Sequence, residues 1–484
     1  MSQYEPVIGL EVHVQLKTKS KLFCGCSTEF GAEPNQNTCP VCLGLPGSLP
    51  VLNKTALDLA IKVGLALESG ISKRIKFDRK NYFYPDLPKA YQISQYDMPV
   101  CHNGHLIIEV RKNGDELTQK KIRMNRAHLE EDAGKLLHEG IQDGSWVDYN
   151  RAGIPLLEVV SEPDLCSPEE AFEYLVRLKA IFQYLNVSDC NMEEGSLRCD
   201  ANISVREKGD TRLGTKVEIK NMNSFRAVQK ALAFEFERQV AVLEKRERLV
   251  QETRLWNEAR GETLSMRSKE FAHDYRYFPE PDLVPFSVPA AHIAELKASL
   301  PELPRARYER FRPQYGLSAY DAHVLVSEKA LADYFEACVN KGVSPKLASN
   351  WIQSELLGEL NQRKLKLSES RVTPHALAGL IRLIEQETIS GKIAKEVLPL
   401  MFETGQSAEA IVEAKGWVQV TDTTLLEEVA ERVIRANPKP ADDVRAGKKQ
   451  AVGFLVGQVM KETKGKANPK LINEILERKL KALR

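Results

Sequence analysis

The stretch Val7-Ile-Gly-Leu-Glu-Val-His-Val-Gln-Leu16 alternates apolar and polar residues. Its even-numbered positions are all aliphatic, while Gly9, Glu11, His13 and Gln15 occupy odd-numbered positions. A period of two is typical of a β-strand with one buried face, so the stretch predicts a strand whose aliphatic side chains enter a core. Glu11 and His13 then lie side by side on the other face. They are either two metal ligands or part of a solvated polar surface.

The same alternation recurs at Met192–Arg206 and at Thr215–Asn221. The polar residues that share a face are Arg198, Asp200, Asn202 and Ser204 in the first stretch and Lys216, Glu218 and Lys220 in the second. Each face is either solvated or the wall of a site. Glu158 differs because it stands inside the apolar run 154–160, where a carboxylate needs a cationic partner.

The cysteines Cys24 and Cys26 are followed, after a polar, Asn-rich loop, by Cys39 and Cys42. Two closely spaced pairs predict a structural zinc site, with all four thiolates on the metal and no coordination position left for chemistry. The alternatives are two pairs of free thiols or a redox pair at Cys39 and Cys42.

The segment 77–97 has no helical or strand period, and it combines tyrosines, Pro85 and Pro88 with both signs of charge. Its bases are Arg79, Lys80 and Lys89. Cations beside aromatic rings suit a phosphate-bearing ligand or a nucleic acid. A rigid corner that only packs is the alternative.

The 484-residue chain carries 68 Lys and Arg against 67 Asp and Glu, so it has no overall attraction for nucleic acid. No apolar run approaches the eighteen residues of a membrane span. The start of the chain resembles neither a signal nor a transit peptide, and nine cysteines, four of them clustered, suit a reducing compartment. We expect a cytoplasmic protein of two to four domains, without a membrane partner.

Helices are predicted at 55–67, at 224–247 and after the capping box Ser167-Pro-Glu-Glu170. Hairpin strands are expected between 99 and 126, with turns at Asn103-Gly and Asn113-Gly. From about 292 onward helices dominate. Residues 441–484 hold eleven bases against five acids, an excess of six that fits local contact with nucleic acid or a solubilising tail.

Several of these stretches together resemble the B subunits of the tRNA-dependent amidotransferases. The resemblance is carried by Ile8–Val14, Phe77–Gln95, His128–Lys135, Met192–Ser204, Asp274–Asp282 and Gly453–Met460, and it spans the chain. No interruption suggests the large insertion of the related archaeal E subunits.

The resemblance implies an α+β, multidomain fold. Residues 1–291 would form an antiparallel-sheet cradle with the zinc site and the kinase and transamidase activity. Residues 292–410 would form an all-α helical domain, and residues 411–484 a small, mobile all-α tail domain that contacts the outer corner of tRNA. The tail residues expected to contact tRNA are Lys448, Lys449, Lys461, Lys464 and Lys466.

The resemblance also implies the reaction. ATP phosphorylates the side-chain carboxylate of glutamate on tRNA(Gln) or of aspartate on tRNA(Asn), and ammonia from the glutaminase (A) subunit displaces the phosphate. A small C subunit completes a heterotrimer. No glutaminase motif and no phosphate loop is recognised in the chain, which agrees with an imported ammonia supply and an unusual ATP site.

By the same resemblance one Mg²⁺ site would be lined by Glu11, His13, Glu131, Glu158, Asp200 and Glu218, with Glu131, Glu158 and Asp200 catalytic. Arg79, Lys80 and Lys89 would bind ATP phosphates or the tRNA acceptor end, and Tyr82 and Tyr84 would stack on the terminal adenine. Two other interpretations compete: a non-catalytic tRNA-binding zinc scaffold, and a ligase that joins ammonia to a small carboxylate metabolite.

Overall fold

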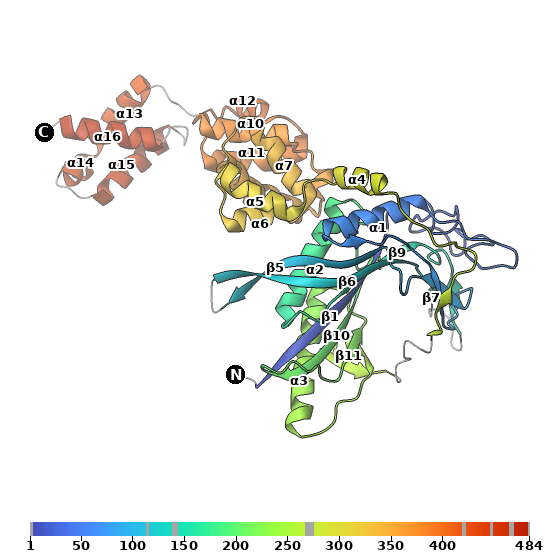
Figure 1. Ribbon diagram of the computed structural model, residues 1–484. Coiled ribbons are helices and arrows are strands. Elements are labelled where there is room, and N and C mark those ends of the chain that lie inside the picture. Colours follow the sequence, from blue (N-terminus) through green and yellow to red (C-terminus); the bar gives the residue numbers. More distant parts are fainter. Residues whose placement is uncertain are drawn as a thin grey trace. The chain divides into compact units, whose positions relative to one another are not determined.

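The computed structural model describes residues 3–112, 116–137, 144–266, 275–418, 423–445, 449–463 and 469–482. It divides into two compact units, Met1–Pro304 and Arg305–Arg484. The first unit is built on a large sheet and the second on helices, which confirms the α+β class (Figure 1). No helix in the described ranges is long and apolar enough to cross a membrane.

Nine strands of the described residues form the large sheet of the first unit. In sheet order they are β13 (Glu262–Ser265), β12 (Thr253–Asn257), β11 (Val217–Lys220), β10 (Leu197–Glu207), β1 (Tyr4–Gln15), β9 (Pro155–Ser161), β6 (Glu116–Glu131), β5 (Cys101–Lys112) and β2 (Gly70–Ile71). Neighbours are antiparallel except β11 and β12, which pair in parallel. The three predicted alternating stretches become β1, β10 and β11, which lie side by side near the middle of the sheet (Figure 1).

The sheet has one apolar and one polar face, as the alternation of β1 predicts. Ile8, Leu10, Val12 and Val14 are almost completely buried in the core of this unit. Helices α1 (Lys54–Ala66), α2 (Pro168–Tyr184) and α3 (Phe225–Glu244) contribute buried side chains to the same core. Because the helices take up the apolar face, the opposite face is left for Glu11, His13 and their neighbours.

The predicted helix start at Ser167 is confirmed, although the Glu170 carboxylate accepts from the backbone N–H of Cys166, at 2.7 Å, and not from that of Ser167 as a capping box requires. Ser167 is extended, and its hydroxyl accepts a hydrogen bond of 3.1 Å from the backbone N–H of Glu170. Pro168 follows at the first helical position, where its missing N–H costs nothing.

The predicted turn at Asn103-Gly is wrong. The residue pair lies inside β5, whose pairing with β6 continues on both sides of it. A two-residue type I′ turn needs positive φ at both central residues, and only Asn103, with a φ of 53°, has it. The strand therefore continues without reversing. The second expected turn, at Asn113-Gly, lies outside the described residues.

Two small sheets hold the loops beside the large one. β3 (Asp78–Asn81) pairs with β4 (Tyr91–Ser94) and with β14 (Phe278–Pro279), and β7 (Lys135–Leu137) pairs with β8 (Trp146–Asp148). The segment 77–97 is therefore a hairpin with an irregular tip. The first unit ends with α4 (Ala290–Ala298), where Leu296 packs in the core and His292 Nε2 lies 2.7 Å from Asp58 Oδ1 on α1.

The second unit contains two separate helical cores. The first uses α5 (Pro304–Tyr315), α6 (Ala319–Val326), α7 (Lys329–Val339), α8 (Pro345–Asn350), α9 (Leu357–Arg363), α10 (Pro374–Glu385), α11 (Gly391–Thr404) and α12 (Ala408–Lys415), with a π-helical stretch Trp351–Leu356 between α8 and α9. The second uses α13 (Thr423–Ala436), α14 (Pro438–Arg445), α15 (Lys449–Glu462) and α16 (Pro469–Ala482). The two cores agree with separate helical and tail domains. The expected first boundary at residue 291 falls inside α4, which packs with the sheet unit, so the three-domain division at 291 and 410 stays a proposal.

Candidate metal and nucleotide site

Strand register brings the candidate acids together on the polar face. His13 of β1 and His128 of β6 each lie directly opposite Glu158 of β9, while Glu11 of β1 lies opposite Asp200 of β10. Residues paired across antiparallel strands point to the same side and lie within a few ångströms of each other. Four strands thus line one surface, a proximity that no single strand reveals.

The first acidic group consists of His13, Glu130 and Glu158, which can offer one ligand atom each within 4.8 Å of one another. His13 Nε2 lies 3.3 Å from Glu158 and 3.8 Å from Glu130. His128 Nε2 lies 3.2 Å from Glu158 and 3.6 Å from Glu130. Each carboxylate thus stands between two imidazoles, and Glu158 has the cationic partners that its place in an apolar strand requires.

The charges of this group depend on one another. Burial alone would lower the pKa of the His13 imidazole, but Glu158 and then Glu130 raise it to about 9. Burial alone would raise the pKa of Glu158, but His128 and His13 hold it well below its usual value. In the absence of a metal the carboxylates are therefore ionised, and a divalent cation would take the place of the imidazole protons.

The second acidic group consists of Glu11, Asp200 and Glu218, also within 4.8 Å of one another. Lys220 Nζ lies 2.5 Å from Asp200 and 3.7 Å from Glu218. Asn202 donates to Glu11 at 2.9 Å, and Thr253 donates to Glu218 at 2.8 Å. An all-oxygen set suits Mg²⁺, whereas the imidazole of the first group also suits transition metals.

Glu131 lies apart from both groups. Because Glu131 follows Glu130 along β6, its side chain points to the opposite side of the strand. There its carboxylate forms an ion pair with Lys89 and accepts a hydrogen bond of 3.1 Å from the backbone N–H of Ile93. Five of the six expected residues therefore divide between the two groups, and Glu131 belongs to neither. Glu130 was missed, although counting two residues from His128 along a strand would have pointed to it.

The bases of segment 77–97 have different surroundings. Arg79 donates to both oxygens of Glu280, at 2.6 and 2.9 Å, and lies over the Tyr91 ring at 4.3 Å. Lys89 forms an ion pair with Glu131. Lys80 has no acid within ion-pair distance in the described ranges, and its ammonium lies 5.0 Å from the ring centre of Tyr275 and 5.7 Å from that of Tyr82.

The positive charge of Lys80 is stabilised by the carboxylates of the first acidic group. Burial opposes its charge, but Glu130 is the strongest of the neighbours that nevertheless raise the pKa of Lys80. Among the three expected phosphate-binding bases, it is the one left available for a ligand. Tyr82 is half-buried beside it, whereas Tyr84 is 56% exposed.

A pocket of about 240 Å³ adjoins the second acidic group. Its wall includes Glu11, Gly9, Val160, Asn202 and Lys216, with further apolar side chains around them. Gly9 adds no side chain to the pocket, and the Oδ1 atom of Asn202 is buried without a hydrogen-bond partner among the described residues. The pocket thus joins an apolar wall, an unsatisfied acceptor and a candidate metal site.

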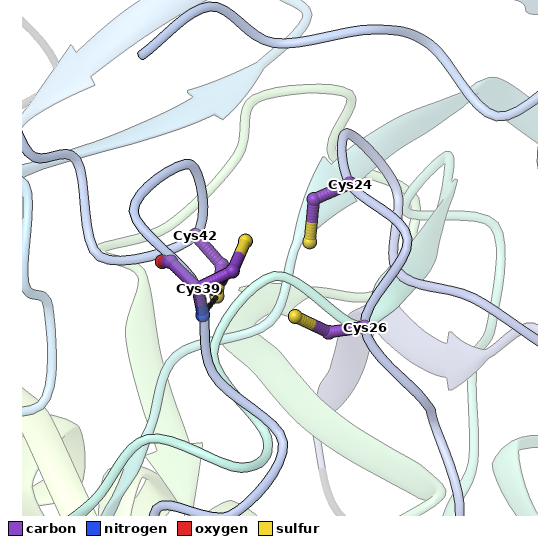
Figure 2. A group of neighbouring side chains, drawn as sticks. All are labelled: Cys24, Cys26, Cys39 and Cys42. Atoms are coloured by element: carbon purple, nitrogen blue, oxygen red, sulfur yellow. Dashed lines mark hydrogen bonds between the residues drawn. The ribbon is translucent and has the colours of Figure 1, made fainter. Parts of the chain in front are cut away.

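The four cysteines come together as predicted, the first pair on one loop and the second on another, with their sulfurs facing one another (Figure 2). Lys21, fully buried, lies with its ammonium 3.7 Å from Cys42 Sγ. A hydrogen bond from Cys24 is the main cause that lowers the pKa of Cys42 to about 5, while burial raises the pKa of Cys26 to about 11. The cluster can hold a metal, and its composition is that of a structural zinc site.

The tail lysines are only partly described. Lys461 is exposed on α15. Lys448, Lys464 and Lys466 lie outside the described residues, and the side chain of Lys449 does as well.

Comparison with known proteins identifies the class to which this fold and site belong. Residues 6–294 match the GatB/GatE catalytic domain, and residues 333–480 match the GatB domain. The chain is 58% identical to the B subunit of the aspartyl/glutamyl-tRNA(Asn/Gln) amidotransferase of Caldanaerobacter subterraneus, over 99% of both chains. It is 56% identical to the protein of that name from Carboxydothermus hydrogenoformans, over the whole of both chains. The chain belongs to the family of amidotransferase B subunits.

Proposed function

We propose that this chain is the B subunit of a cytoplasmic, heterotrimeric, tRNA-dependent amidotransferase. It would use ATP to phosphorylate the side-chain carboxylate of Glu-tRNA(Gln) or Asp-tRNA(Asn) and then form the amide with ammonia. The ammonia would come from a glutamine-hydrolysing A subunit, with a small C subunit in the complex. The proposal is supported by family membership, by two acidic groups on one face of the large sheet, and by Lys80 of β3, which has no ion pair within the described ranges.

The chemistry needs cations, because a substrate carboxylate and the γ-phosphate of ATP are both anions. An oxygen of the carboxylate forms a bond to phosphorus while the bond to ADP breaks, giving an acyl phosphate. The nitrogen lone pair of ammonia then attacks the carbonyl carbon, inorganic phosphate leaves, and the nitrogen loses a proton. Mg²⁺, when bound, neutralises phosphate charge in the first step.

The residues of the polar face divide this work. Glu11, Asp200 and Glu218 would hold Mg²⁺, and His13, Glu130 and Glu158 would hold a second divalent ion closer to Lys80. Lys80 would bind the transferring phosphoryl group, and His128 would orient Glu158. Glu131, expected to be catalytic, would act through Lys89 as a positioning residue.

The pocket beside Glu11 is the proposed site for the nucleoside of ATP. Its apolar wall suits a base, its Asn202 oxygen is available to a donor, and its edge meets the acidic group that would hold the metal of the phosphates. Zinc at the four cysteines would have a structural role, because four thiolates leave no open position.

The test uses the complete complex with γ-labelled ATP and Glu-tRNA(Gln), without glutamine or ammonia. Label captured on the aminoacyl-tRNA, and lost in Glu158→Gln and Glu218→Gln, supports the kinase function. Glu194→Gln, the same change at an exposed position, is the matched control. If ATP stays intact while tRNA binds, the chain is a recognition scaffold and the kinase proposal fails.

A further inference from the structure

A basic pocket of about 460 Å³ lies at the other side of the polar face and belongs to neither acidic group. It is lined by segments 72–74, 96–99, 102–103 and 125–126. Arg126 of β6 pairs with Val160 of β9, and Val160 pairs with Glu11 of β1. Paired residues point to one side, so Arg126 shares the face of the candidate metal sites.

The cations of this pocket have no ion pairs with described residues. Lys73 and Arg74 are exposed, and the Nε atom of Arg126 is buried without a hydrogen-bond partner in the described part of the chain. The acid of the wall, Asp97, lies 2.6 Å from the ammonium of Lys76 and is neutralised by it. Three cations thus converge on a cavity, an arrangement that attracts phosphate.

A row of tyrosines connects the basic pocket with Lys80. Tyr96 lines the pocket and stacks on Tyr277, with ring centres 4.5 Å apart and planes 16° apart. Tyr277 meets Tyr275 edge to face, with ring centres 6.1 Å apart and planes 74° apart, and Tyr275 meets Tyr82 in the same way, at 6.0 Å and 72°. Lys80 stands over the Tyr275 and Tyr82 end.

The cations, the tyrosine rings and Lys80 beside the first acidic group therefore follow one another in that order. Single-stranded nucleic acids are bound by such combinations, in which cations contact the backbone and bases stack on aromatic side chains. A free nucleotide would need only one ring and one phosphate site. The row continues over three rings beyond Tyr96, which fits a ligand of several nucleotides.

We propose that the pocket formed by Lys73, Arg74 and Arg126 binds backbone phosphates of the single-stranded 3′ end of the aminoacylated RNA. The following bases stack along the tyrosine row and bring the aminoacyl group to Lys80. This assignment rests on the proposed function, because it takes the substrate to be an aminoacyl-RNA whose side chain reacts beside Glu158.

The test measures equilibrium binding of labelled RNA hairpins to the full complex at several salt concentrations. One hairpin carries a four-nucleotide single-stranded 3′ extension, and the other ends blunt. Each phosphate contact on a single strand contributes about 0.7 to the slope of log affinity against log salt. Lys73→Gln/Arg74→Gln is therefore expected to flatten the slope by about 1.4 for the extended hairpin and to leave the blunt one unchanged.

A second variant separates stacking from charge. Tyr96→Leu keeps an apolar contact with Tyr277 but removes a ring, so we expect binding of the extended hairpin to weaken about fivefold or more at every salt concentration without a change in slope. The control is Arg246→Gln/Arg248→Gln, which removes the same charge from exposed positions after α3, a helix on the apolar side of the sheet.

The outcomes are separable from those of the kinase test. An unchanged slope in the Lys73/Arg74 variant, or an equal change in the control, overturns the assignment. Equal weakening for both hairpins overturns the single-strand assignment and points to duplex contact. A flattened slope for the extended hairpin alone supports the RNA site even if no phosphate is transferred, so it survives failure of the kinase proposal.

Discussion

Arg79→Ala should loosen the β3–β14 pairing rather than remove a ligand contact. The Arg79 guanidinium donates to both oxygens of Glu280, whose side chain is completely buried, whereas Arg79 is 21% exposed. The backbone N–H of Glu280 also donates to the carbonyl of Phe77, so the Arg79–Glu280 pair and this hydrogen bond hold together two segments that are distant in sequence. Removing one partner leaves the other as an uncompensated buried charge.

The size of the effect follows from the hydrogen bonds that are lost. Loss of hydrogen bonds to a charged group costs about 1.5–3 kcal/mol. We therefore expect local opening to become about tenfold to 150-fold more frequent.

Hydrogen exchange of the full chain, read by mass spectrometry on peptides covering β3 and β14, measures this opening. Arg79→Met/Glu280→Leu, which removes both charges and keeps apolar bulk, should regain most of the protection. Unchanged protection in Arg79→Ala, together with a raised KM for ATP or tRNA, would show that Arg79 binds a ligand and that this reasoning is wrong.

Three further predictions concern other parts of the chain. The purified protein should contain about one zinc per chain and lose it in Cys39→Ser. Lys21→Met should weaken zinc retention, because four thiolates around Zn²⁺ leave an excess negative charge that the Lys21 ammonium offsets. Metal analysis checks both, with Cys338→Ser, at a buried cysteine outside the cluster, as the control. Gly9→Leu should fill the pocket beside Glu11 and raise the KM for ATP about tenfold or more, whereas Gly9→Ala, whose Cβ would meet nothing closer than 3.8 Å, should not. Burial raises the pKa of Glu336, but hydrogen bonds from Arg310 and Arg307 bring it below 4.5, so its contribution to stability is present above that value and is lost as pH falls further. Glu336→Gln should make α7 less dependent on pH below 4.5, and hydrogen exchange that changes with pH as in the unmodified chain would contradict this.

The polar face shows how much of the site the local sequence pattern can predict. Alternation in β1, β10 and β11 gives the side on which Glu11, His13, Asp200 and Glu218 stand, because a strand has a fixed period of two. It does not give the partner strand. The distribution of five of the six expected ligands over two groups follows from the registers β1–β10, β10–β11, β1–β9 and β6–β9, and the two registers of β1 join residues more than a hundred positions apart.

The bases of segment 77–97 show what the composition of a segment cannot predict. Their composition predicts a binding surface, but Arg79 and Lys89 are taken by Glu280 and Glu131, and only packing reveals this. The tyrosine row is likewise invisible in the sequence, since Tyr275 and Tyr277 come from a segment almost two hundred residues after Tyr82.

The sequence by itself determined the cysteine cluster, the N-cap of α2 and the chemical types of the site residues, because each depends on short-range periodicity, spacing or hydrogen bonding within a few residues. The fold class came from the sequence in another way, as what the resemblance of its long motifs to a known family implies. The tertiary structure alone decided which of Glu130 and Glu131 faces the acidic site, which of the described cations stay available, and where phosphate and rings align. Those outcomes depend on strand register and on competition between distant charges for the same partner, and neither is encoded locally.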